Sequence, residues 1–141
     1  MGIVVKRFPD YGLTLDIWRG SVAAEEIIEH FEGMTLAEAG LRISFIDPAA
    51  NLYAMDIAHI PALKRVSDRL LNELYAGRPM YSAIVCAPGE NKPVVEFWLR
   101  YAWPEHEDGR HPVVFPSLEE AFDWLGLPEG ARREVIKALE P

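Results

Sequence analysis

The sequence contains a single cysteine, Cys86, among its 141 residues. One thiol cannot form a disulfide within the chain or a multi-cysteine zinc site, so both are excluded. The neighbours of Cys86 are apolar, and an apolar setting raises the pKa of a thiol and makes it unreactive. We therefore expect a buried packing residue at this position rather than a nucleophile.

Long hydrophobic runs are also missing. No stretch approaches the ~20 apolar residues that a membrane-spanning helix needs. Residues 1–7 lack the basic region, apolar run and cleavage site of a signal peptide. Position 6 is Lys rather than Ser or Thr, so N-myristoylation is not expected. These features predict a cytoplasmic protein without a membrane span.

Basic side chains are scarce, with 14 Lys and Arg against 22 Asp and Glu and a net charge of −8. Nucleic-acid backbones are bound mainly by Lys and Arg, so nucleic acid is not an expected partner. The sequence also lacks the P-loop, GxGxxG, GxSxG and HExxH motifs. We accordingly predict no cofactor, no metal and no catalytic residue.

The chain does have enough apolar residues, half of the total, to form one core. Residues 3–8 and 13–18 are predicted to form a hairpin, because turn-forming residues lie between them. Within residues 13–18 every second side chain is Leu or Ile, which predicts a strand with one buried face. Residues 1–127 should form one α/β domain. Residues 128–141 should form an amphipathic helix packed on that domain or on a partner.

Helices and strands should alternate after the hairpin. Helices are predicted at residues 24–33, from 61 to about 77, at about 92–103 and at 117–125. Ser117 and Glu120 have the spacing of a capping box at the start of the last of these. Strands are predicted at residues 52–57, 81–87 and 113–115. Residues 41–46 suit either a further strand or irregular packing. This order predicts an α/β fold with a mixed, mostly parallel sheet of five or six strands and right-handed crossovers.

Four segments resemble the SpoIIAA-like family, which belongs to the wider group of STAS and Sec14-like domains. They are residues 20–26, 47–56, 81–88 and 113–126, and the last is the most distinctive. The family commonly has Thr near position 23, where this chain has Ala23, so Ser21 is expected to cap the first helix. The resemblance implies a STAS-like fold and a non-enzymatic regulatory or protein-interaction domain. Its Sec14-like side implies, as an alternative, a carrier of a small apolar, lipid-like ligand.

Anti-sigma-factor antagonists of this fold carry a phosphorylatable serine at the start of the helix after the third strand. The matching segment here, residues 56–63, contains no Ser or Thr. Ser67 comes two turns into the predicted helix, where an interior serine is expected. The resemblance therefore implies a domain without the phosphorylation switch.

A third hypothesis, an enzyme, rests on Asp56 and His59. They follow a predicted strand on the side where open α/β sheets bind ligands, and an Asp–His pair can act as a general base. Their spacing suits local capping equally well. Residues 105–111 contain two histidines, but their loop context favours a solvated loop over a metal site. His30 is expected on the solvated side of the first helix.

Residues 94–103 have only Glu96 and Arg100 as a polar strip, spaced to pair at i,i+4. Their apolar positions cover more of the helix than one sheet can bury. Either the C-terminal helix, through Val135, Ile136 and Leu139, covers the excess or a partner does. The side chains expected to contact a ligand or partner are Asp56, His59, Trp98, Leu99, Tyr101 and Trp103. A homodimer built partly on Leu99 and Trp103 is predicted.

Overall fold

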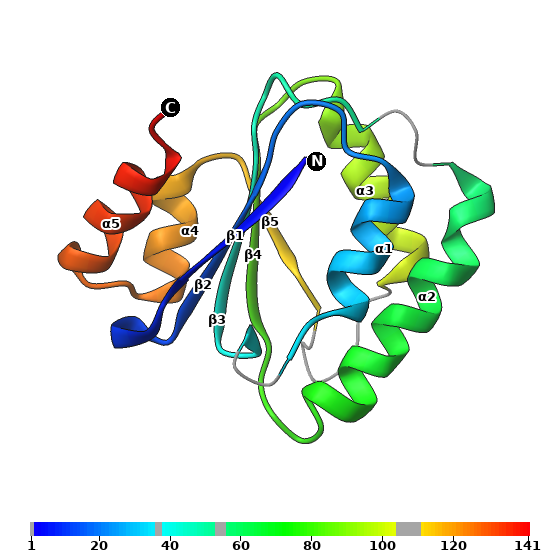
Figure 1. Cartoon of the computed structure of the whole chain (residues 1–141), viewed down its shortest axis with the longest axis horizontal. Coiled ribbons are helices and arrows are strands. Elements are labelled where there is room, and N and C mark those ends of the chain that lie inside the picture. Colours follow the sequence, from blue (N-terminus) through cyan, green and yellow to red (C-terminus); the bar gives the residue numbers. More distant parts are fainter. Residues whose placement is uncertain (1, 36–37, 53–55, 104–110) are drawn as a thin grey trace.

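The five strands of the structure form one mixed sheet (Figure 1). A computed structural model of the chain describes residues 2–35, 38–52, 56–103 and 111–141. The strands are β1 (Ile3–Phe8), β2 (Leu13–Trp18), β3 (Leu41–Ile46), β4 (Tyr81–Cys86) and β5 (Val113–Phe115). They lie in chain order; β1 is antiparallel to β2 and all other pairs are parallel. The predicted fold class and the hairpin at the antiparallel edge are confirmed.

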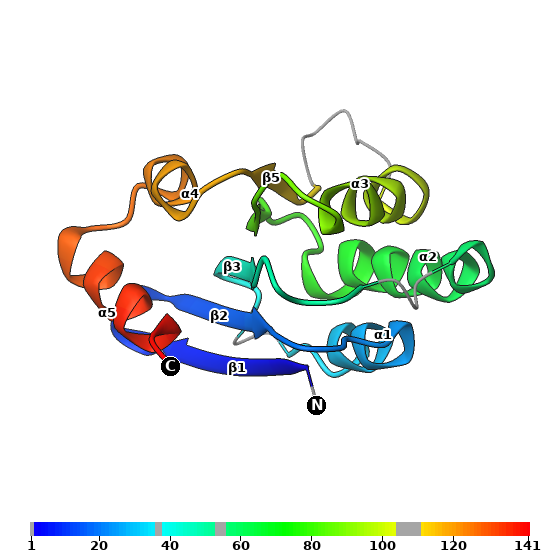
Figure 2. The same cartoon turned by 90° about the horizontal axis from the view of Figure 1, so that it is seen from above.

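Helices cover both faces of the sheet (Figure 2). They are α1 (Ala24–Glu32), α2 (Ile60–Arg69), α3 (Asn91–Ala102), α4 (Leu118–Leu125) and α5 (Glu129–Leu139). A 3-10 turn, η3 (Ile57–His59), precedes α2, and a π-helical turn, η4 (Leu70–Leu74), extends it. The crossover helices α1, α2 and α3 lie on one face, and α4 and α5 lie on the other. Each helix in the described residues is too short or too polar to cross a bilayer.

In the described residues the third strand is formed by residues 41–46. Leu52, Asp56 and Ile57, the described part of the strand predicted at residues 52–57, lie outside any strand. Leu52 is buried in irregular chain, and residues 53–55 lie outside the described residues. Asp56 caps η3, because its side chain accepts a hydrogen bond from the backbone N–H of Ala58 at 2.8 Å. The capped turn therefore engages the backbone N–H groups of Asp56 and Ala58 in contacts with side chains.

Both faces of β2 are buried, which corrects the prediction of one buried face. Leu15 packs in the core beneath α4 and α5, and Trp18 packs in the core beneath α1, α2 and α3. Asp16, on the same face as Trp18, is fully buried. Polar and apolar side chains therefore alternate along β2 because its two faces belong to two different buried layers. Neither face of this strand is exposed to solvent.

The C-terminal helix packs on the domain but does not cover α3. Val135 of α5 is fully buried in the core layer that contains Leu15, on the far side of the sheet from α3. Ile136 is 50% exposed. The proposed cover of α3 by α5 is therefore wrong, because a short connection from β5 leads α4 and α5 to the opposite face (Figure 2).

The two predicted helix caps have different outcomes. Ser117 caps α4, since its Oγ accepts a hydrogen bond from the backbone N–H of Glu120 at 3.3 Å. Gly126 ends α4 in the left-handed conformation, with φ of 65°. Ser21 does not cap α1: the N-cap residue is Ala23, which has no side-chain cap. The backbone of Ser21 instead forms an isolated bridge with Asn51.

We predict that Ser117→Ala lowers the free energy of unfolding by about 1 kcal/mol, because it leaves an N–H group at the start of α4 without an acceptor. Ser21→Ala is the matched control and should change stability by only a few tenths of a kcal/mol. Urea denaturation of both variants measures the difference. Equal losses would contradict the assignment of the cap.

Candidate functional site

A buried ion pair lies on the sheet face beneath α1. The guanidinium of Arg42 on β3 approaches the carboxylate of Asp16 on β2, with an N–O distance of 2.8 Å. The side chains are 2% and 0% exposed. The second carboxylate oxygen of Asp16 accepts a hydrogen bond from Nε1 of Trp18 at 2.6 Å. Both oxygens of the buried carboxylate are therefore engaged, as burial of a charge requires.

His30, in the last turn of α1, points at this pair. Its Nε2 lies 3.7 Å from Oδ2 of Asp16 and 3.4 Å from a guanidinium nitrogen of Arg42, and its side chain is 9% exposed. The prediction of a solvated position was wrong. His30 follows the fully buried Ile27 by three residues and shares its side of the helix. Burial lowers the pKa of His30, and the opposing effect of Asp16 is smaller, so the neutral imidazole is favoured.

A second ion pair lies next to the first. The side chains of Arg7 on β1 and Glu38 approach to 3.0 Å, and the hydroxyl of Thr35 donates to the same carboxylate oxygen at 3.0 Å. Burial acts to raise the pKa of Glu38, but the hydrogen bonds from Arg7 and Thr35 outweigh it and lower that pKa. The backbone carbonyl of Glu38 accepts a hydrogen bond from Arg42 at 3.3 Å. The two pairs thus form one connected polar cluster.

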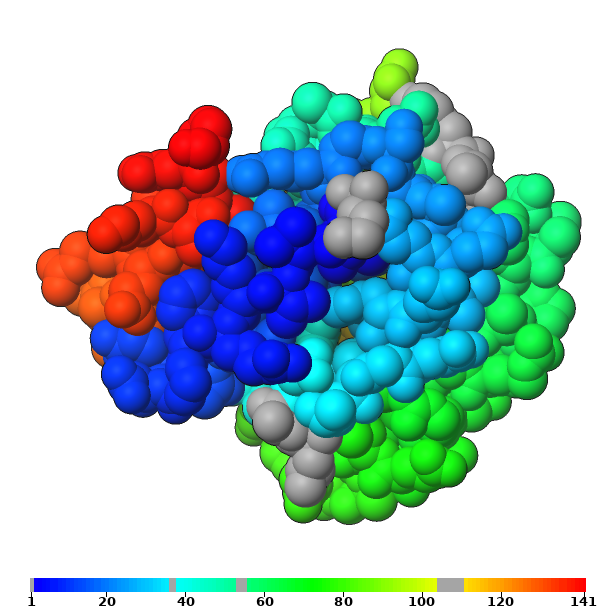
Figure 3. All heavy atoms as spheres, viewed as in Figure 1, coloured from blue at the N-terminus to red at the C-terminus, as the bar shows by residue number. Residues whose placement is uncertain are grey.

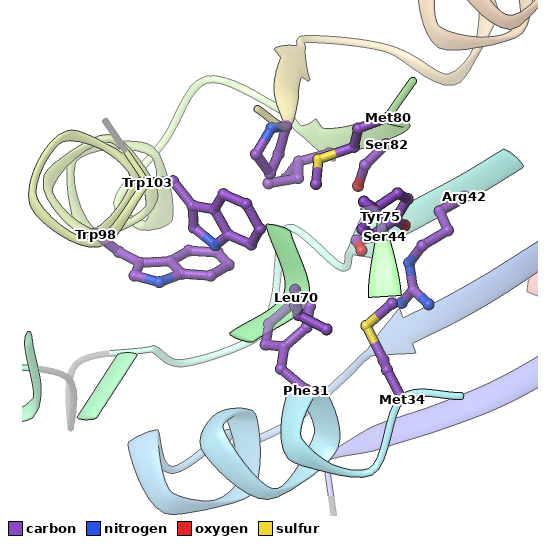
Figure 4. A pocket seen from close by; sticks show the side chains of 12 residues that line it. Phe31, Met34, Arg42, Ser44, Leu70, Tyr75, Met80, Ser82, Trp98 and Trp103 are labelled. Carbon is purple, nitrogen blue, oxygen red and sulfur yellow. The ribbon is translucent and has the colours of Figure 1, made fainter. Parts of the chain in front are cut away.

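A small cavity borders the cluster between the sheet and the helices (Figure 4). Arg42, Ser44 and Ser82 supply polar groups to its wall, and Trp98 and Trp103 stand at its apolar side. Its volume is about 20 Å³. That is room for about one water molecule, whereas pockets for small ligands measure roughly 300 Å³ or more. The cavity therefore gives no support to the lipid-carrier hypothesis.

Two of the predicted contact residues, Trp98 and Trp103, belong to the core. They are 1% and 5% exposed. The ring of Trp98 lies 6.2 Å from that of Trp18 and 5.7 Å from that of Phe31, in tilted packing. Trp103 has too little exposed surface to build the predicted dimer interface.

Leu99 and the polar strip of α3 face a second hollow. Leu99 is half-buried and lies with Glu96, Arg100 and His111 in an open groove of about 560 Å³ between α3 and β5. The ion pair of Glu96 is with Lys92, at 3.9 Å, in place of the predicted pairing with Arg100. Residues 104–110, which include most of the histidine-containing segment 105–111, lie outside the described residues.

Asp56 and His59 serve as a local cap. The backbone N–H of Asp56 donates to Nδ1 of His59 at 3.1 Å, which completes a capping box around η3. Nε2 of His59 lies 3.3 Å from a carboxylate oxygen of Glu25, near the start of α1. These contacts join the beginnings of α1 and α2, and they occupy both ring nitrogens.

Cys86 and Ser67 have the environments that the sequence predicts. Cys86 is 2% exposed, and burial raises the pKa of its thiol. Ser67 is 1% exposed and its hydroxyl donates to the backbone carbonyl of Leu63 at 2.8 Å. Within the described ranges, His, Cys, Asp and Glu side chains form no group of three that could hold a metal ion.

An apolar hollow of about 350 Å³, here called the α2–α3 groove, lies between the start of α2 and the outer side of α3. It is lined by Ile57, Ile60, Pro61, Phe97 and Tyr101. Ile57 is 76% exposed and Tyr101 is 53% exposed. The rings of Phe97 and Tyr101 are 5.1 Å apart. Sequence analysis identified Tyr101 but missed the others, although the wide apolar surface of residues 94–103 indicated an excess on this helix.

No protein-family model matches the sequence, and no curated protein matches it. The resemblance to the SpoIIAA-like family therefore stays a prediction that rests on the four segments quoted for it.

We predict that Arg42→Met lowers the free energy of unfolding by about 3–5 kcal/mol, because it leaves the carboxylate of Asp16 buried without its cation. Lys64→Met, which removes the cation of the exposed Lys64–Asp68 pair at 2.7 Å, is the matched control and should cost less than about 1 kcal/mol. The double variant Asp16→Leu, Arg42→Met should regain most of the loss. Chemical denaturation measures all three; a double variant no more stable than Arg42→Met would refute this account of the cluster.

The lowered pKa of His30 predicts a loss of stability in acid. The folded state resists protonation of His30, whereas the unfolded chain takes up the proton near the ordinary value of 6.5. The unfolded state therefore binds more protons as the pH falls through and below 6.5, and the free energy of unfolding decreases. His30→Gln should reduce this decrease, measured by urea denaturation at about pH 7.5 and about pH 5.5. An unchanged pH dependence in the variant would contradict the assignment.

Proposed function

We propose that the chain is a cytoplasmic, non-enzymatic regulatory or protein-interaction domain of the STAS-like type, and that the α2–α3 groove is its binding surface. The observation that carries the proposal is the exposure of Ile57 and Tyr101, 76% and 53%, in one apolar hollow. A soluble chain rarely gathers large exposed apolar side chains in one place unless they contact a partner.

The non-enzymatic part of the proposal is supported by the groups that could carry chemistry. Asp16, Arg42 and His30 contact one another in the core. The thiol of Cys86 is buried with a raised pKa. Asp56 and His59 are occupied by the capping of η3. Each of these groups has a structural contact that accounts for its position.

The regulation proposed here does not use a phosphorylated serine. The segment that leads into α2, residues 56–63, has no hydroxyl side chain, and Ser67 is buried inside the helix. Instead, this segment contributes Ile57, Ile60 and Pro61 to the α2–α3 groove. Binding would therefore depend on apolar contact rather than on a change of charge at the helix start.

A protein partner fits the groove better than a small apolar ligand does. Small-ligand pockets bury most of the surface of the ligand. The α2–α3 groove is open, and Ile57 on its rim is mostly in water. The partner is another protein or a second copy of this chain. For a homodimer, the large apolar side chain of α3 that is exposed is Tyr101, whereas Trp103, which follows the helix, is buried.

We predict that Ile57→Glu weakens partner binding or self-association by at least about tenfold, because a carboxylate would have to be desolvated in an apolar contact. Ile136→Glu is the matched control, since Ile136 is 50% exposed on α5, across the sheet. Affinity capture from the native host, quantified by mass spectrometry, and light scattering of the purified chain measure the two kinds of association. Circular dichroism checks that both variants fold.

Binding that is equal in wild type and Ile57→Glu would overturn the assignment of the groove. So would a loss that Ile136→Glu reproduces to the same extent, because the effect would then follow from added charge anywhere on the surface.

A further inference from the structure

The two helices that form the α2–α3 groove are basic in an acidic chain. α2 contains three basic residues and one acidic residue, and α3 contains two and one, which gives them a combined net charge of +3. The whole chain carries −8, so the remaining residues carry −11. α2 and α3 belong to the helical layer on one face of the sheet, and α2 lies at the edge of the molecule (Figure 3). Of these basic side chains, Lys64 and Arg65 lie one turn beyond Ile60 and Pro61 of the groove. Arg69 instead donates to the backbone carbonyls of Phe31 and Glu32, and Arg100 lines the groove between α3 and β5.

Arg65 continues the lining of the groove along α2. It follows Pro61 by four residues and therefore lies on the same side of the helix, one turn further on. Its side chain is exposed and forms no ion pair with any residue that the structure describes. Lys64 follows Ile60 by the same spacing and is paired with Asp68 at 2.7 Å, where both side chains are about half-exposed. Arg65 is thus an exposed cation one turn beyond the apolar hollow, and the nearby Asp68, three residues further along α2, is paired with Lys64.

From this arrangement we infer that the α2–α3 groove binds an acidic protein segment that carries large apolar side chains. This inference rests on the proposed function and specifies its partner. The apolar side chains of the segment fill the hollow between Ile57 and Tyr101, and its carboxylates lie near Arg65. Complementary charge fixes the orientation of the segment and raises its association rate, while apolar contact supplies most of the affinity.

An anionic membrane also attracts basic and apolar side chains, but the structure favours a protein segment. Interfacial helices insert a protruding apolar face into the lipid, whereas the α2–α3 groove is a hollow of about 350 Å³. The −11 carried by the rest of the chain also repels an anionic surface. A hollow with a cation on its rim accepts a side chain better than it accepts a flat layer of headgroups.

The test is a selection of peptides on the full-length purified chain. A phage-displayed library of random peptides of about 16 residues, long enough for a helical or extended segment to fill a groove, is panned on the wild type. We expect the enriched peptides to carry net negative charge and at least two large apolar residues. Synthetic copies should bind Arg65→Glu at least about tenfold more weakly than wild type. Arg133→Glu, a reversal of an exposed arginine on α5, is the matched control and should bind normally.

The outcomes separate this inference from the proposed function. One outcome is that the enriched peptides are neutral or basic and bind Ile57→Glu more weakly than wild type. This would overturn the acidic partner but would keep the groove as an interaction site. Absence of enrichment, or binding that Ile57→Glu does not reduce, would overturn both. Sedimentation of the chain with phosphatidylserine vesicles that depends on Arg65 would replace the acidic segment by a membrane. A dimer in light scattering that depends on Ile57 would replace it by a second copy of the chain.

Discussion

The handedness of the parallel crossovers determines where every other part of this molecule lies. Strands β2 to β5 are neighbours in chain order, so successive right-handed crossovers place α1, α2 and α3 on the same face of the sheet. The opposite face is left for α4 and α5. α3 therefore has α2 as its helical neighbour, and the side of α3 that faces neither α2 nor the sheet stays at the surface. The α2–α3 groove is a consequence of this arrangement.

The same arrangement explains why a charged pair is tolerated in the core. α1 covers the end of the sheet where β2 and β3 bring Asp16 and Arg42 together, and it adds His30. The pair depends on the register of the two strands, because a shift of one residue would turn Arg42 to the other face. An ion pair of this kind specifies the alignment of neighbouring strands more than it adds net stability. The polar cluster thus serves the fold, whereas the groove is the proposed site of contact with a partner.

Local chemistry made some elements predictable, and tertiary contact decided the rest. The opening hairpin and the cap at Ser117 follow from short-range signals, and both were found correctly. The strand at residues 41–46 could not be separated from irregular packing by sequence, because short apolar runs at residues 41–46 and 52–57 look alike. The cap at Asp56 shows that the second run does not continue as a strand through Asp56 and Ile57. The burial of His30 depends on Asp16, which lies on another element. The groove was missed because it joins η3, α2 and α3, which no sequence window contains together.

The central claim is that the outer side of α3 is covered by a partner in the cell and open in the isolated chain. Hydroxyl-radical footprinting of Tyr101 and Tyr81 tests it directly, because these two tyrosines are similarly exposed, 53% and 47%, and only Tyr101 lines the groove. The account predicts that both are oxidised in the purified chain and that only Tyr101 is protected in intact host cells. Equal oxidation of the two tyrosines in cells, or equal protection of both, would contradict it.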